Sequence, residues 1–341
     1  VAGGHTAQHC AAVLSNIAAA EPRLARRAAS VPQALPALVA AVACGDDSAK
    51  GCSGALAAIA EADPALAQRV VEVPGARPAL VAAVAAGGAE GASGSQQATA
   101  KHSALALANI VSASPRLAQC VAGAEGALPA LVAAISAGGD TATNCASALS
   151  DMAAADPCLA QRVTEAPGAL RTLVSAVAAG AAEAASASRQ AAATNSALVL
   201  ANIASANPGL AQRVVEEEGA LLALVFAVAA GGLAATNSAK ALRVVAGASP
   251  ALTQRVAKAP GALPALVAAV AAGGNTAAAA EGTLDVVKTW ARAAVAAAGT
   301  ACCHCGRGAD SATGVRLGVC AGCNSARFCN AECQRHAWNS H

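Results

Sequence analysis

The sequence has very few aromatic side chains: Tyr is absent, Phe and Trp occur twice each, and aromatic residues make up 1% of the 341 positions. Charged residues are also scarce, at 12%, and the net charge of +2 provides no broad field to attract nucleic acid or an acidic membrane. The apolar runs are short, and the longest, around 220–230, cannot span a bilayer. These absences disfavour aromatic-rich sheets and membrane spans. Because the chain begins with Val, we expect it to be a fragment.

Ala is abundant instead, and one Ala-rich phrase recurs six times. Typical copies read GALPALVAAISAGG and GARPALVAAVAAGG. The intervals between successive copies alternate between 42 and 51 residues. The copies begin at Gln33, Gly75, Gly126, Gly168, Gly219 and Gly261. The long part of the chain is therefore a set of repeats.

Each repeat carries signals for three helices. Apolar residues in the recurring phrase follow helical spacing, as in Leu128, Leu131, Val132 and Ile135, and a Gly pair then predicts the end of the helix. A second helix runs through HSALALANIVSA, and a third opens where a polar residue precedes Pro, as at Asp63-Pro64. Short helices that cannot bury an apolar face alone must stack on neighbouring repeats, which predicts an all-α, right-handed α-solenoid.

Two repeats carry about nine additional residues each, near GAEGASGSQQATAK and GAAEAASASRQAAA. We expect these residues to lengthen a loop or a helix start, with disorder as the alternative.

The phrases GALPALV and ALxNI, with the Pro-initiated helix, resemble the armadillo repeat family over residues 1–299, and a HEAT-like solenoid is the alternative. Asn16, Asn109 and Asn202 stand 93 residues apart at one helical position. The resemblance implies that such Asn lie on the concave face and contact the main chain of extended peptides. Alternatively, each Asn braces its own repeat. Aromatic residues are missing one turn earlier, so we do not expect an importin-like role.

A second ladder consists of Arg side chains, with Cys120 at the sixth place: Arg27, Arg69, Arg162, Arg213 and Arg255. We expect these Arg to form charge pairs or to cap carbonyl groups between successive repeats, with a phosphate-binding stripe as the alternative.

Seven of the 13 Cys lie between residues 302 and 333, in the spacings Cys-x2-Cys, Cys-x2-Cys and Cys-x3-Cys. Such knuckles place thiolates correctly for tetrahedral Zn²⁺, which indicates a metal-stabilised tail. A disulfide framework is the weaker alternative because 13 is odd and nothing else indicates secretion. The other six Cys are scattered through the repeats, and we expect them to be small buried hydrophobic residues.

Residues 302–341 resemble a MYND-type zinc finger, in which an aromatic residue precedes C-x3-C-Q and W-x2-H follows. The resemblance implies two interleaved zinc ions. One site would use Cys302, Cys305, Cys329 and Cys333, and the other Cys320, Cys323 and His341. The family's eighth ligand falls three residues beyond His341, so the second site has three ligands here unless water or His336 completes it. The resemblance also implies that Gln334 and Trp338 contact proline-containing peptides.

Together these patterns predict a non-enzymatic adaptor that binds zinc and protein or peptide partners, in the cytoplasm or nucleus, without a membrane. One alternative is a fragment of a MYND-associated lysine methyltransferase, but a SET domain needs a Tyr that is absent here. Another is a nucleic-acid-binding regulator, but the Arg residues of the tail form no continuous basic patch in the sequence.

Overall fold

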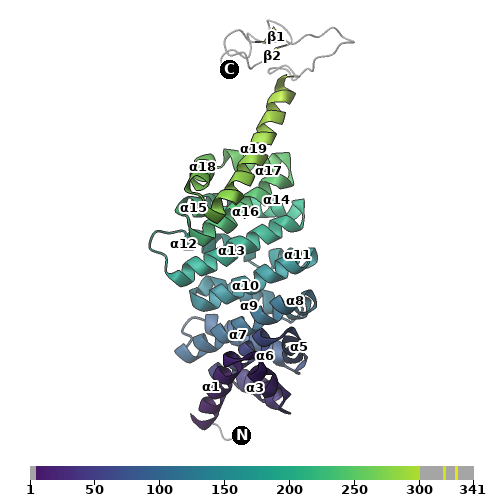
Figure 1. Ribbon diagram of the computed structural model, residues 1–341, viewed down its shortest axis with the longest axis vertical. Coiled ribbons are helices and arrows are strands. Elements are labelled where there is room, and N and C mark those ends of the chain that lie inside the picture. The colour runs from purple at the N-terminus through teal and green to yellow at the C-terminus, as the bar shows by residue number, and fades with distance from the viewer. Residues whose placement is uncertain (1–4, 300–317, 320–326, 329–341) are drawn as a thin grey trace. The chain divides into compact units, whose positions relative to one another are not determined.

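The computed structural model describes residues 5–299, 318–319 and 327–328, and these residues form helices with one short strand pair (Figure 1). The repeats contain the three predicted helices. The short first helices are α2 (Pro22–Ser30), α5 (Pro64–Glu72), α8 (Pro115–Ala122), α11 (Pro157–Glu165), α14 (Pro208–Glu216) and α17 (Pro250–Lys258). The second helices are α3 (Ala34–Cys44), α6 (Ala76–Gly88), α9 (Ala127–Ala137), α12 (Ala169–Gly180), α15 (Ala220–Ala230) and α18 (Ala262–Ala272). The third helices are α1 (His5–Ala20), α4 (Ala49–Ala62), α7 (Gly94–Ala113), α10 (Gly139–Ala155), α13 (Ala187–Ala206), α16 (Gly232–Ala248) and α19 (Gly274–Gly299).

The helix boundaries follow the predicted capping signals. Five first helices open with a polar N-cap whose side chain accepts a backbone N–H, and Pro follows directly. The N-caps are Asp63, Ser114, Asp156, Asn207 and Ser249. Five second helices are preceded by a Gly in the left-handed conformation, such as Gly126 at φ 71°. The first repeat has Gln33 there instead, at φ 66°. These turns set the angle between the first and second helices in every repeat.

Within residues 1–283 the helices stack by type, so that each second helix packs on the next second helix and each third helix on the next third helix. Five of the third helices, α4, α7, α10, α13 and α16, bury one Leu each at the same position, with no exposed surface: Leu56, Leu107, Leu149, Leu200 and Leu242. The same position in α1 is Leu14, which is 37% exposed, since the described residues include no third helix before α1 to cover it. Stacking therefore supplies the core that a single repeat lacks, and the predicted all-α solenoid is confirmed.

The additional residues of the two longer repeats extend both a loop and a helix. Residues 89–93 and 181–186 connect the second and third helices, and α7 and α13 have 20 residues each, against 17 in α10 and α16. Ser93 and Gln96 form a reciprocal capping box at the start of α7. The expected lengthening of a loop and a helix start is confirmed, and the alternative of disorder is wrong at these positions.

Contacts divide the chain into two compact parts, Val1–Thr283 and Leu284–His341. The described residues of the second part are the end of α19 and two strands, β1 (Gly318–Val319) and β2 (Arg327–Phe328). The strands pair antiparallel, with Gly318 opposite Phe328 and Val319 opposite Arg327. Helix α19 ends at Gly299, close to the predicted domain boundary between 299 and 302, which stays a prediction.

Among the described helices, no single one is both long and apolar enough to cross a membrane, although four bent helix pairs pass that test by length and composition.

Candidate functional site

The predicted Asn ladder lies on the third helices. Asn109 in α7 is half-buried, and its amide Nδ2 donates to the carbonyl oxygen of Ala57 in α4 at 3.1 Å. Asn202 in α13 is half-buried in the same way and donates to the carbonyl oxygen of Ser150 in α10, also at 3.1 Å. Asn16 is exposed in α1. Two of the three Asn therefore tie their helix to the preceding third helix. Their assignment as peptide contacts stays a prediction.

A second polar row runs along the same helices, seven residues earlier in each, and the sequence analysis did not identify it. Asn144 donates to the carbonyl oxygen of Lys101, and Asn195 donates to that of Thr143. Asn237 in α16 makes the same bond to Thr194. Each amide thus reaches the carbonyl group just before the corresponding residue of the preceding repeat. The signal in the sequence is the recurrence of Asn seven residues before the position of the Asn ladder, at 144, 195 and 237.

His102 occupies this second row in α7. Its Nδ1 lies 3.2 Å from the carbonyl oxygen of Lys50, so the ring donates from Nδ1–H in the same way as the amides. Burial lowers the pKa of His102, and the Lys101 and Lys50 charges lower it further, while the bond to the Lys50 carbonyl opposes them. The imidazole is therefore held neutral, as a structural substitute for Asn.

Asp151 stands in α10 where the flanking repeats have Asn109 and Asn202. It is half-buried, and burial raises the pKa of its carboxyl group. Asp151 therefore interrupts the Asn row with a partly desolvated carboxyl group.

Four of the five Arg in the ladder cap carbonyl groups between repeats, as predicted, and no such bond is described for Arg27. Arg69 donates to the carbonyl oxygen of Ala29 at 2.8 Å, and Arg162 donates to that of Ala122 at 2.7 Å. Arg255 donates to the carbonyl oxygen of Val215 at 2.9 Å, and Arg213 reaches that of Thr164 at 3.5 Å. These guanidinium groups bind the C-terminal ends of the preceding first helices, where partial negative charge gathers. This geometry gives the ladder a structural role.

The scattered cysteines follow the prediction only in part. Cys52 and Cys145 are buried, and burial raises the pKa of the Cys145 thiol to about 12, so that thiol is unreactive. Cys10, Cys44 and Cys158 are exposed, so the expectation that they are buried is wrong. All six cysteines in the described part of the chain are free thiols.

The predicted zinc ligands lie outside the described residues, as do Gln334 and Trp338: Cys302, Cys305, Cys320, Cys323, Cys329, Cys333 and His341. The described residues between them form the strand pair. In the sequence, Cys320 directly follows β1 and Cys329 directly follows β2. Because the strands are antiparallel, their C-terminal ends lie at opposite ends of the pair. Seven soft and imidazole donors in knuckle spacing are a chemically suitable set for Zn²⁺. No cluster of three potential ligands occurs among the described residues.

Comparisons with known proteins agree with both parts. Residues 302–341 match the family model described as the MYND finger. No curated protein gave a significant match to the chain. Among solved structures, the designed armadillo repeat protein YIII(Dq)4CqI is 26% identical, with a TM-score of 0.62 over 74% of this chain and 99% of its own. The designed armadillo repeat protein YIII(Dq.V1)4CPAF, solved in complex with the peptide (KR)4, gives the same identity, TM-score and coverage. A computationally designed armadillo repeat protein for modular peptide recognition is 27% identical, with the same TM-score and coverage.

Proposed function

We propose that this chain, which combines armadillo-type repeats with a C-terminal MYND-finger sequence, is a non-enzymatic adaptor that binds zinc and assembles protein partners. The observation that carries the proposal is the match of 302–341 to the MYND finger, placed after a solenoid of helical repeats. Solenoids offer long continuous surfaces, and zinc fingers of this size have no room for a substrate pocket of their own. We place this function in a reducing compartment, cytoplasm or nucleus, because zinc-binding thiolates must stay reduced.

Two zinc ions are proposed for the complete finger, in the interleaved arrangement that the family resemblance implies. The match of 302–341 to the MYND finger and the knuckle spacing of its Cys residues support this arrangement. Zinc would neutralise thiolate charge and hold a tail whose sequence is too short and polar to form a core.

Zinc stoichiometry tests this site directly. Elemental analysis of purified protein should show that Cys302→Ser and Cys320→Ser each lower the zinc content. Cys303→Ser is the matched control, because that thiol lies inside the first knuckle but outside the proposed ligand set. Equal zinc loss in the control, or no zinc in the unaltered chain, would contradict the ligand assignment.

Peptide binding by the finger is proposed for Gln334 and Trp338. Trp338→Ala should abolish binding of proline-containing peptides while the zinc content stays normal, and Arg335→Ala serves as the neighbouring control. Unchanged peptide affinity in Trp338→Ala, measured by fluorescence anisotropy, would remove the finger from the proposed binding surface.

A second peptide surface is proposed along the third helices, at Asn16, Asn109, Asp151 and Asn202. One of the similar designed proteins carries a bound peptide, which supports this location. The Asn amides also brace neighbouring helices, so the two roles need separation. Asn202→Ala should weaken binding of peptides selected from a phage-displayed library by about 1–3 kcal/mol, beyond any loss of thermal stability. A loss of stability with unchanged peptide affinity would leave Asn202 with the bracing role alone.

The absence of catalysis is part of the proposal. A methyl-transfer assay with labelled cofactor should give no signal above that of a Cys302→Ala variant. A clear excess would instead support the methyltransferase alternative.

A further inference from the structure

Two exposed positions of the second helices hold different residues in two of the repeats. In four of the six second helices, two exposed positions one turn apart hold Pro and Ala. These pairs are Pro36 and Ala40, Pro78 and Ala82, Pro129 and Ala133, and Pro264 and Ala268. Helix α15 instead has Leu222 and Phe226 at these positions, and α12 has Arg171 and Ser175. The deviations occur on two neighbouring helices that pack on each other.

Leu222 and Phe226 contribute little to the stack. Their exposed fractions are 52% and 55%, although they are large apolar residues in a chain with only two Phe. Four other repeats fold with small or rigid residues at these places, so packing between repeats does not explain the pair. Large apolar side chains left in water favour association with another surface.

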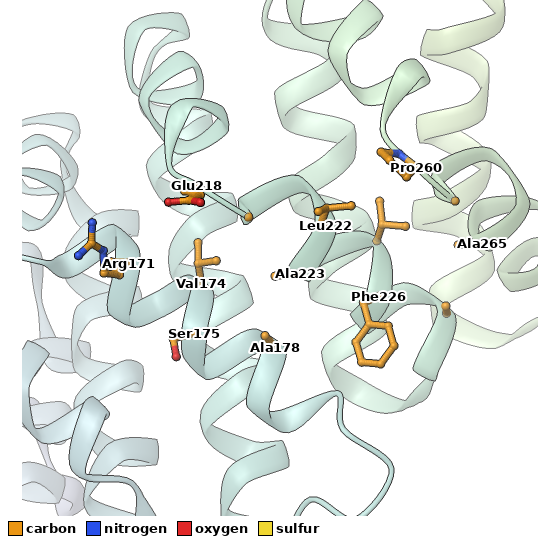
Figure 2. Close-up of a pocket in the computed structure, with 14 residues that line it drawn as sticks. Arg171, Val174, Ser175, Ala178, Glu218, Leu222, Ala223, Phe226, Pro260 and Ala265 are labelled. Carbon is orange, nitrogen blue, oxygen red and sulfur yellow. The ribbon is translucent and has the colours of Figure 1, made fainter.

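The pair lines a groove of about 690 Å³ formed by α12, α15 and the start of α18. Figure 2 shows Leu222 and Phe226 on α15, Val174 and Ala178 on α12, and Glu218 beside Val174. The hollow lined by α3, α6 and the start of α7 measures about 180 Å³, and the one lined by α9, α12 and the starts of α10 and α13 about 390 Å³. Phe226 also borders a second hollow, of about 670 Å³, which includes the exposed Leu233. The groove is thus concave and mostly apolar on both sides of one aromatic ring.

The same repeat adds negative charge at one end of the groove. Glu216, Glu217 and Glu218 form a run just before α15, whereas every other repeat carries at most one carboxylate across these three positions. Arg171 lies 3.7 Å from Glu217, so that pair is close to neutral. Glu216, at the end of α14, is not among the residues that line the groove, and it accepts a hydrogen bond from Gln212. Glu218 lines the groove and is exposed. The rim therefore has an excess of negative charge.

We infer that this groove binds a basic amphipathic helix of a partner protein, with apolar side chains one turn apart against Leu222 and Phe226 and Lys or Arg against Glu218. A helix fits better than an extended peptide because the groove is lined by apolar side chains of helices, whose backbone groups are already bonded. An extended strand would leave its own N–H and C=O groups unpaired there, whereas a helix satisfies them internally. The residues that line this groove belong to α12, α15, α18 and the turns before α15 and α18, and they do not include the Asn row of the third helices.

Binding of defined peptides to the full chain tests this inference. The probes are a synthetic amphipathic helix of Leu, Ala and Lys, the same peptide with Glu in place of Lys, and a scrambled Lys peptide. The Lys helix should bind, with affinity that falls as salt increases. Phe226→Ala should weaken it about tenfold or more, because a central aromatic residue is removed. Glu218→Gln should weaken binding of the Lys helix, because it removes the carboxylate that lines the groove.

Val267→Ala is the matched control, since Val267 is 57% exposed on α18 and does not line the groove. Four other repeats have Ala at the position of Phe226, so Phe226→Ala should leave the helical circular dichroism unchanged. Equal affinity of the Lys helix for the unaltered chain and for Phe226→Ala would overturn the inference. So would preference for the Glu helix, or self-association of the chain that Phe226→Ala abolishes in sedimentation velocity. Zinc content does not enter this test, so its failure leaves the proposed adaptor function unaffected.

Discussion

At the scale of single residues, the repeats show which side chains are interchangeable. His102 and Asn144 make the same bond to the preceding third helix, although an imidazole can take up a proton and an amide cannot. Gln33 and Gly75 occupy the same turn, although only Gly adopts its left-handed conformation without strain. Positions where one repeat differs from the others therefore show which replacements the fold accepts.

Replacing His102 with Asn should keep the bond to Lys50 and remove a pH dependence. The folded-state pKa of His102 is lowered from its ordinary value of 6.5, so below that pH the unfolded chain takes up protons first. The contribution of neutral His102 is therefore present above pH 6.5 and is lost as the pH falls. Thermal melts should agree at pH 7.5, and at pH 5 His102→Asn should melt higher than the unaltered chain, by up to a few degrees. A constant difference across this range would contradict the prediction.

Replacing Gln33 with Gly should stabilise the first repeat by about 0.5–1 kcal/mol, because a left-handed residue with a Cβ costs more than the added flexibility of Gly. The reciprocal change, Gly75→Gln, should destabilise by about 1 kcal/mol. Denaturant midpoints measure both changes. A lower midpoint for Gln33→Gly would show that its side chain makes a compensating contact.

At the scale of elements, one interface between repeats uses a different Arg to cap a backbone carbonyl group. Cys120 in α8 lacks the guanidinium that its counterparts use to cap the preceding first helix. Arg77 in α6 instead donates to the carbonyl oxygen of Cys120 itself, at 3.0 Å. The other second helices have Leu at the place of Arg77. The missing guanidinium at Cys120 and the added one at Arg77 therefore concern the same pair of neighbouring repeats. The usual Arg reaches back to the preceding repeat, whereas Arg77 reaches forward to the next one.

This exchange predicts a compensating pair of substitutions. Arg77→Leu should destabilise by about 1–2 kcal/mol, because the carbonyl group loses a charged donor. Adding Cys120→Arg should recover much of this loss, because the new Arg can reach the carbonyl of Val71, as Arg162 reaches that of Ala122. Denaturation midpoints of the two single variants and the double variant form the cycle. Strictly additive effects would show that the two residues act independently.

At the scale of the whole molecule, the repeats and the Cys-rich C-terminal sequence depend on different sources of stability. The repeats bury apolar side chains between stacked helices, and the Cys-rich end carries a donor set for metal. Loss of zinc should therefore affect one and spare the other. The free thiols and carboxylates of the described helices form no cluster that a metal would need.

Chelation of zinc should change the environment of Trp338 and leave the helical signal at 222 nm unchanged. A Trp290→Phe variant makes Trp338 the single fluorophore of this type, since the chain has two Trp. Restoring zinc should restore the original fluorescence. A large loss of helical signal on chelation would show that the repeats depend on metal, contrary to this prediction.

The sequence by itself determined the helical repeats, their caps and the zinc-binding character of the C-terminal end. Those features depend on local patterns: Pro after Asp63, Gly at 126, and Cys pairs at knuckle spacing. The Arg capping ladder was also predictable because a repeated interface must repeat its bonds. Only the tertiary structure decided that Asn109 and Asn202 bond to the preceding helix, since that depends on how closely two third helices approach. It likewise decided that Leu222 and Phe226 stay exposed beside a groove, because the packing of α12 against α15 sets which positions of a helix reach water.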